Sequence, residues 1–104
     1  MNTTEFLNSV YGDDDRNSLF SIYQFIDDLL NDCEDKNDFS TCDELLIQVD
    51  LNRCTISTAL GFVTAFFPAR DKIGAYPFYY SRLKNHLTLL DPFRVDSLMR
   101  GLDP

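Results

Sequence analysis

Few residues in this chain have the types and spacing that catalysis requires. Acid–base and nucleophilic enzymes usually need a positioned base, and the 104 residues contain one histidine, His86. No G-x-S-x-G elbow occurs, and no cysteine has a catalytic partner near it in the sequence. We therefore expect a protein that is not an enzyme, with His86 on a helix flank in contact with solvent.

Zinc binding is a second chemistry that the residue types suggest. Cys33, Cys42 and Cys54 could supply ligands together with His86. These residues are widely separated, whereas zinc modules are recognised by closely spaced ligand pairs. Because the spacing indicates neither a zinc site nor a disulfide framework, we expect reduced, partly buried thiols and no cofactor.

Calcium binding is suggested by the start of an EF-hand pattern. Asp13, Asp15 and Asn17 occupy the first ligand positions of such a loop. The sixth position should be Gly and is Ser18, and the twelfth should be Glu and is Gln24. We therefore expect no calcium loop. The aspartates at 13–15 instead suit a helix N-terminus, where negative charge interacts favourably with the helix dipole.

Acidic residues dominate the chain and are unevenly distributed. Seventeen acidic against nine basic residues give a formal net charge of -8. Residues 1–50 contain 13 acids and 2 bases, whereas residues 51–104 contain 4 acids and 7 bases. This excess of negative charge disfavours direct binding to nucleic acid or to an anionic membrane, and it favours a cationic partner.

The chain carries no pattern typical of export or membrane insertion. Its first residues lack the basic and apolar regions of a secretory signal. The longest uncharged run, Cys54–Ala69, is shorter than the about 20 apolar residues that a membrane span needs. We expect a cytoplasmic protein that folds as a single acidic helical domain over residues 1–104.

The densest cluster of charge, over residues 27–44, is the strongest functional signal. It contains eight acidic residues and one base. On a helical wheel Phe20 lies beside Gln24, Asp27 and Asn31, and an aromatic ring surrounded by charge is a common interaction hot spot. We predict that a partner contacts Phe20, Asp27, Asp28, Asp32, Glu34, Asp35 and Asp38, together with Asp13, Asp14 and Asp15.

Two other interpretations of the acidic residues stay open. They could serve only to keep a small protein soluble. They could also imitate nucleic acid, but a helix with an acid every four residues carries one charge per about 6 Å, against one per about 1.7 Å in duplex DNA. Mimicry therefore requires residues 13–15, 27–35 and 38–44 to converge on one face.

Hydrophobic residues recur at helical spacing along the chain and predict an all-α fold, a small irregular bundle of five to six short helices. The expected helices span residues 3–10, 13–33, 41–49, 55–67, 77–90 and 92–100, with loops at 34–38 and 68–76. The helix over 55–67 is the most apolar and is expected at the centre, where Gly61 would allow another helix to cross closely. The apolar stripe of the second helix comprises Leu19, Ile22, Tyr23, Ile26, Leu29 and Leu30.

Two helix starts are predicted from capping residues. Ser40 or Thr41, followed three residues later by an acid, resembles a capping box for the third helix. Asp91 as cap and Pro92 at the first helical position are expected to open the last helix, and Gly101 is expected to follow its end.

Five basic residues of the second half have two possible uses. They are Arg70, Lys72, Arg82, Lys84 and Arg94. A helix-turn-helix is disfavoured, because the connection between the helices at 55–67 and 77–90 is longer than the turn of that motif. The net charge also opposes an approach to DNA. We expect these bases to pair with the acidic half, within one molecule or across a dimer.

The sequence thus predicts a non-enzymatic acidic binding module that docks on a basic surface of a larger partner, such as a nucleic-acid-handling complex, and inhibits or regulates it. Small acidic helical inhibitors that phages and mobile elements carry against nuclease defence are of this kind, an analogy of class that no motif supports. The alternative is a self-associating structural or subunit protein whose acidic and basic halves pair across a homodimer.

Overall fold

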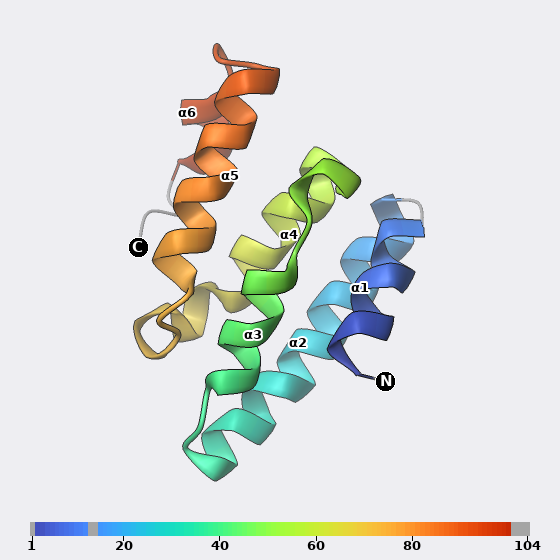
Figure 1. Ribbon diagram of the computed structural model, residues 1–104, viewed down its shortest axis with the longest axis vertical. Coiled ribbons are helices and arrows are strands. Elements are labelled where there is room, and N and C mark those ends of the chain that lie inside the picture. The colour runs from blue at the N-terminus through green and yellow to red at the C-terminus, as the bar shows by residue number, and fades with distance from the viewer. Residues whose placement is uncertain (1, 13–14, 101–104) are drawn as a thin grey trace.

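The computed structural model describes residues 2–12 and 15–100, excluding the side chains of residue 12 and residues 15–18. Within these ranges the chain is helical without strands, so the predicted fold class is confirmed (Figure 1). The α-helices are α1 (Thr3–Gly12), α2 (Asp15–Lys36), α3 (Ser40–Gln48), α4 (Ile56–Phe66), α5 (Tyr76–Leu90) and α6 (Val95–Met99). Two 3-10 helices, η1 (Leu51–Arg53) and η2 (Phe67–Lys72), flank α4.

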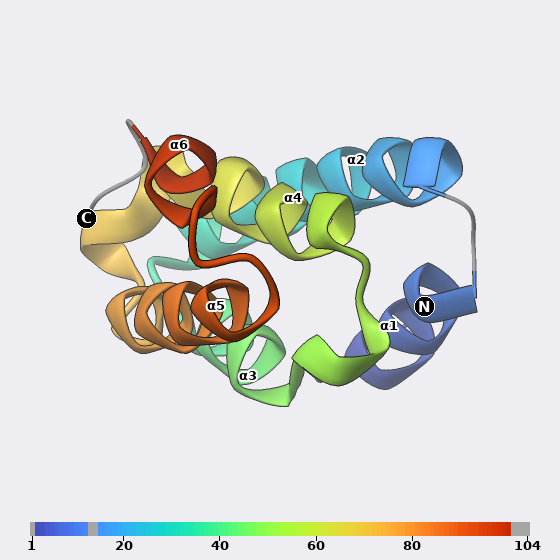
Figure 2. The same ribbon diagram turned by 90° about the horizontal axis from the view of Figure 1, so that it is seen from above.

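The helices lie in two layers, with α2, α4 and α6 on one side and α1, α3 and α5 on the other (Figure 2). Helix α4 packs most closely against α2 and also contacts α5, which confirms its expected central position. At Gly61 an added Cβ would lie 2.8 Å from Leu19 Cδ2 of α2. The missing side chain therefore lets α2 and α4 approach each other.

Aromatic rings connect four of the helices. The Phe6 ring of α1 stacks on Phe25 of α2, with the ring centroids 3.9 Å apart. Phe62 of α4 meets both Phe6 and Tyr79 of α5 edge to face. The Tyr79 hydroxyl donates to the Ala59 carbonyl at 2.7 Å, and burial raises its pKa, so the hydroxyl keeps the proton that it donates. These contacts hold α2 against the rest of the core.

Helix α2 is longer than predicted and ends in a Schellman motif. Asn37 has a φ of 53°, its N–H donates to the Glu34 carbonyl at 3.2 Å, and the Asp38 N–H donates to the Cys33 carbonyl at 3.0 Å. Residues 34–36, predicted as loop, are therefore the last helical turn. The sequence pattern missed this end because an asparagine in the left-handed region, rather than a glycine, terminates the helix.

Replacing Asn37 with alanine is expected to lower the free energy of unfolding by about 1 kcal/mol. Alanine has no local hydrogen bond that compensates for the left-handed conformation, whereas Asn37→Gly should leave stability equal to or above that of the original chain. Urea unfolding of both variants measures this. An equal loss in the glycine variant would show that the side-chain amide, and not the backbone conformation, is what matters.

Three other predicted boundaries are wrong. Ser40 lies inside α3, and its N–H donates to Asp38 Oδ1 at 3.0 Å, so Asp38 replaces the predicted capping box. The predicted loop at 68–76 contains most of η2. Helix α6 begins at Val95 rather than at Pro92, because Asp91 ends α5 and the chain makes a turn first. Gly101 lies outside the described residues.

Helix α2, despite its 22 residues, carries too many polar side chains for a membrane span, and no other described helix is long and apolar enough for one.

Candidate functional site

An open groove of about 680 Å³ follows the solvent side of α2 and is termed here the α2 groove. Its second wall is formed by Ala65 at the end of α4 and Pro68 in η2. The lining residues of α2 are Phe20, Tyr23, Gln24, Asp27, Leu30, Asn31 and Glu34. Because nearly all of the lining comes from one continuous helix, the side chains of the groove have fixed spacing.

The spacing in the sequence explains why these residues share one side. Phe20, Asp27 and Glu34 follow one another at intervals of seven residues. Seven residues make nearly two helical turns, so these side chains stand in a line with about 10 Å between successive members. Tyr23 and Leu30 repeat at the same interval and form an apolar line beside the first. An aromatic ring, two carboxylates and an apolar strip thus lie along one groove.

Two aromatic side chains of the groove are exposed. Phe20 is 70% exposed, which agrees with its predicted place on the polar side of the helix. Tyr23 is 44% exposed, so its assignment to the apolar stripe of the core is wrong. Tyr23 lies at the edge of that stripe and lines the groove, whereas Ile22 and Ile26 of the same stripe are fully buried.

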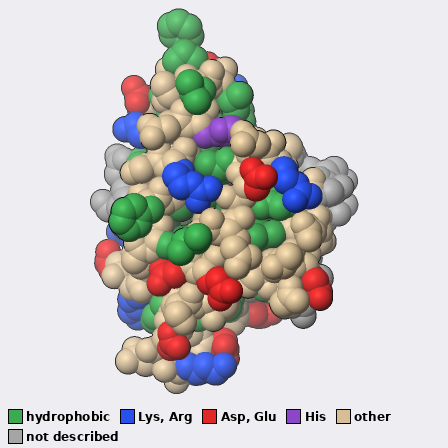
Figure 3. Space-filling view, in the orientation of Figure 1, with side chains coloured by type: hydrophobic (Ala, Val, Ile, Leu, Met, Phe, Trp, Pro, Cys, Tyr) green, Lys and Arg blue, Asp and Glu red, His purple; other side chains and the backbone are tan. Residues whose placement is uncertain are grey.

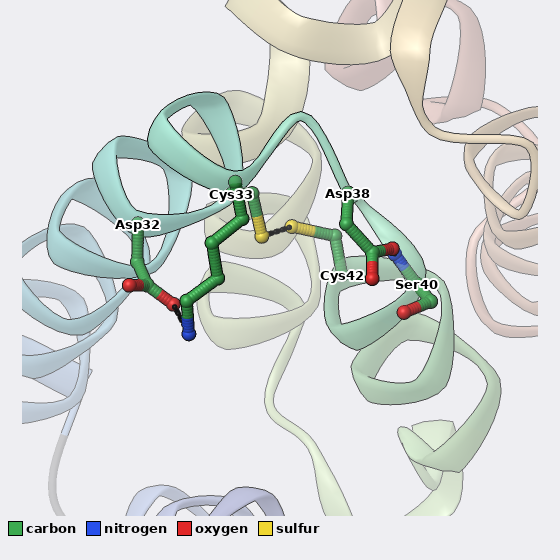
Figure 4. Close-up of polar contacts among 6 residues, drawn as sticks. Asp32, Cys33, Asp38, Ser40 and Cys42 are labelled. Carbon is green, nitrogen blue, oxygen red and sulfur yellow. Dashed lines mark hydrogen bonds and ion pairs between the residues drawn. The ribbon is translucent and has the colours of Figure 1, made fainter.

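No cation lines the α2 groove, and few described cations neutralise the acidic residues of α2. Asp32 pairs with Lys36 at 3.1 Å, and Glu34 lies 4.0 Å from Lys72 (Figure 4 shows the first pair). Both pairs are more than half exposed, so each contributes at most about 1 kcal/mol. Within the described residues, Asp27, Asp28 and Asp35 form no ion pair, and they stay available to an external cation.

The remaining predicted contact residues do not join the groove. Asp28 lines a neighbouring hollow of about 260 Å³ between α1 and α2, which shares Gln24 with the groove. Asp35 is exposed outside the lining, and hydrogen bonds from the Ser40 N–H and hydroxyl hold the pKa of Asp38 below its usual value. Asp13, Asp14 and the Asp15 side chain lie outside the described residues. The structure therefore brings together Phe20, Asp27 and Glu34.

The acidic run at 38–44 does not form a continuous charged surface. The carboxylate of Asp43 is partly buried and accepts the Ala75 N–H at 2.9 Å, which ties α3 to the start of α5. Asp38 caps α3. Two of the three acids in this run therefore have structural roles, and the convergence that nucleic-acid mimicry requires is not seen among the described residues.

Three basic residues of the second half contact backbone carbonyls or an acid of their own half. Arg82 donates to the Leu46 and Val49 carbonyls at the end of α3, at 3.3 and 2.7 Å. Arg70 donates to the Phe67 carbonyl at 2.8 Å and lies over the same ring. Arg94 pairs with Asp91 of its own half at 3.6 Å. The expectation that these bases pair with the acidic half inside one molecule is wrong for all of them except Lys72, as far as the structure describes the chain.

A second set of exposed hydrophobic side chains, missed by the sequence reasoning, is spread along α5 and the turn after it. Four of these side chains are 59% to 95% exposed: Phe78, Leu89, Leu90 and Phe93. In Figure 3 hydrophobic side chains mark the top of the molecule, whereas most acidic ones lie toward the turn between α2 and α3. The signal was the spacing of Phe78 and Leu89, which places both opposite the buried Tyr80 and Leu83. Leu90 is exposed although it lies at helical spacing from the buried Leu83 and Leu87.

The candidate metal ligands are not assembled into a site. Cys33 and Cys42 are buried with their sulfur atoms 3.6 Å apart, and Cys54 is half-buried and His86 partly exposed. In the parts of the chain that the structure describes, no three His, Cys, Asp or Glu side chains are placed to hold a metal ion. Residues 13 and 14 of the partial EF-hand pattern fall outside those parts.

Comparison of the chain with protein-family models, with curated proteins and with solved structures finds no match.

Proposed function

We propose that this chain is a non-enzymatic binding module whose α2 groove docks on a basic surface of a larger protein partner and thereby inhibits or regulates that partner. One observation carries the proposal. The exposed ring of Phe20 stands in line with the carboxylates of Asp27 and Glu34 on one rigid helix, and no cation lines the groove. An exposed aromatic side chain has no stabilising role in the monomer, and its burial by a partner is favourable.

The geometry of the groove defines what a partner must present. Two carboxylates about 10 Å apart complement two cations at the same separation, which a helix supplies at an interval of seven residues. An apolar pocket placed a further two turns along would receive Phe20. Such discrete cations flanked by apolar surface are typical of a protein interface, whereas a groove that binds a polyanion matches a negative charge every few ångströms. The partner is therefore contacted through a hot spot with a charged rim.

Proteins that handle nucleic acid are the partner class that fits best. Their surfaces gather lysine and arginine side chains to hold phosphates. The net charge of -8 steers this chain toward such a surface and away from nucleic acid itself. A module bound there would cover part of the phosphate-binding surface, which is the proposed means of inhibition.

Parallel affinity capture from cell extract tests the proposal. The bait is compared with a groove variant, Phe20→Ala/Asp27→Asn/Glu34→Gln, and with a matched control, Phe78→Ala/Glu44→Gln/Asp96→Asn. The control removes one exposed phenylalanine and two exposed carboxylates elsewhere. A basic protein held by the original chain and by the control, and lost by the groove variant, supports the proposal. Equal capture by all three baits, or loss with the control alone, contradicts it.

Self-association is a second candidate, favoured by the exposed hydrophobic surface of α5. This helix contains Arg82 and Lys84 and no acid, whereas α2 is acidic, so the charges of α5 complement those of the α2 groove. A second copy could place Phe78 and Leu89 of α5 against the groove. If the contact is reciprocal, with α5 of each copy against the α2 groove of the other, it closes a two-fold symmetric homodimer.

Sedimentation at several protein concentrations separates the two candidates. A stable monomer at micromolar concentration removes self-association as the function of the groove. Growth of the assembly with concentration, abolished by either Phe20→Ala or Phe78→Ala, supports it instead.

A further inference from the structure

Cys33 and Cys42 are placed against each other across the turn that joins α2 to α3. Cys33 lies in the last turns of α2 and Cys42 in the first turn of α3, and their side chains point toward one another (Figure 4). The sulfur atoms are 3.6 Å apart, and both residues are at most 2% exposed. The fold therefore holds two thiols in contact that are nine positions apart in the sequence.

We propose that Cys33 and Cys42 are a site of disulfide formation in the folded protein, closed by exchange with a small disulfide such as oxidised glutathione. A thiolate of the pair attacks the small disulfide, which gives a mixed disulfide and one free thiol. The second thiolate then attacks the protein sulfur of that mixed disulfide, closes the Cys33–Cys42 bond and releases the second small thiol. The two protein thiols are oxidised, the small disulfide is reduced to two thiols, and the two protons stay with these products.

The proposal requires little movement of the chain. A disulfide needs a sulfur separation of about 2.05 Å, so the two sulfur atoms must approach by roughly 1.5 Å. The Schellman motif and the Asp38–Ser40 hydrogen bond already fix the turn between the two residues. The rotation of two short side chains therefore supplies most of the change.

The disulfide would restrain the acidic turn between α2 and α3. The closed segment contains Glu34, which lines the α2 groove, and also Asp35 and Asp38. A covalent link between α2 and α3 removes conformational freedom mainly from the unfolded chain. Oxidation is therefore expected to stabilise the fold and to leave the groove in place, and the inference does not depend on the proposed binding function.

The surroundings of the cysteines make the reaction slow but selective. Burial, and next the hydrogen bond with Cys33, raise the pKa of Cys42, so this thiol is protonated at neutral pH, and a small disulfide reaches the pair only when the turn between α2 and α3 opens locally. Cys54, in turn, has its pKa raised to about 11 by burial and by the nearby Asp50 carboxylate. Alkaline pH speeds exchange at Cys54 as well, but only Cys33 and Cys42 have a second thiol in contact that can close an internal bond.

The test uses the full chain, incubated in native buffer at alkaline pH with oxidised glutathione and then analysed by mass spectrometry without reduction. The expected product is a monomer lighter by two hydrogen atoms, with a peptide link between Cys33 and Cys42. Its Tm should lie about 10 °C above that of the reduced chain, and dithiothreitol should reverse the shift.

Variants in which one cysteine is replaced keep the test decisive. Cys54→Ser should form the link as the original chain does, whereas Cys33→Ala and Cys42→Ala should remain without it and show no oxidant-dependent Tm shift. The proposal is overturned if the native chain gives only glutathione adducts or unreacted thiols. It is equally overturned if the link forms only in denaturant, or if the oxidised chain has an unchanged or lower Tm.

Discussion

Reversing the charge of Asp27 and Glu34 together, as Asp27→Lys/Glu34→Lys, is expected to weaken binding of the captured basic partner about 100-fold, roughly 3 kcal/mol. The change removes two attractions and puts two cations in the groove opposite the cations of the partner. Both side chains are exposed, and a lysine near the C-terminal end of α2 interacts favourably with the helix dipole, so the variant should fold. Titration calorimetry with the purified partner measures the loss.

A charge-matched variant separates position from net charge. Glu44→Lys/Asp96→Lys changes the net charge by the same amount at exposed residues of α3 and α6, outside the α2 groove. Its affinity should fall by less than about tenfold, since distant exposed charges act only through a screened field. Similar losses in both variants would show that total charge, and not the groove, determines binding.

Truncating Phe62 to alanine is expected to lower the free energy of unfolding by about 4 kcal/mol. The side chain is fully buried at the centre of the molecule, where its ring meets Phe6 and Tyr79 edge to face. Its loss leaves a cavity that the surrounding helices cannot close, and 4 kcal/mol is a large part of the stability of a domain of this size. Chemical denaturation of the variant gives the value.

Phe78→Ala is the matched control for this measurement. The ring of Phe78 is 74% exposed on α5, and its removal should change the free energy of unfolding by less than about 0.5 kcal/mol. If both variants lost the same stability, the assignment of Phe62 to the core and of Phe78 to the surface would be wrong.

Helical periodicity predicted the architecture well but placed individual side chains less reliably. The all-α class, the central position of α4 and the close helix crossing at Gly61 all follow from spacing and residue size. In α4 helical spacing predicts a single buried stripe that leaves out Phe62 and comprises Ile56, Ala59, Leu60, Val63, Phe66 and Phe67. Helix α4 packs against α2 on one side and α5 on another, so more of its surface is buried than one stripe covers.

Helix ends were the least predictable feature because they depend on three-dimensional hydrogen bonds. A capping box and the bond that Asp38 makes to Ser40 both use an acidic or hydroxyl side chain near a helix start, and the sequence does not distinguish them. Asp43 was counted as surface charge, although its carboxylate accepts the N–H of Ala75, which is far away in the sequence. The contact between Cys33 and Cys42 likewise depends on how α2 and α3 meet.

The candidate site was predictable where it lies on one helix and not where it needs two. The interval of seven residues places Phe20 and Asp27 on one line whatever surrounds α2. Glu34 joins that line only because α2 continues to Lys36, beyond its predicted end at Cys33. The second wall, from Ala65 and Pro68, exists only because α4 crosses α2. The exposed hydrophobic side chains of α5, Phe78 among them, were not predicted, because the buried stripe of a helix does not determine which residues occupy its other side.

The most direct test of the central claim is an NMR footprint of the partner on the isotope-labelled chain. Amide signals should shift or broaden over residues 20–34 of α2 and over residues 65–68 across the α2 groove, and these changes should vanish at high salt. Changes confined to α5 and the turn after it, or an α2 footprint that is insensitive to salt, would contradict docking through the acidic groove.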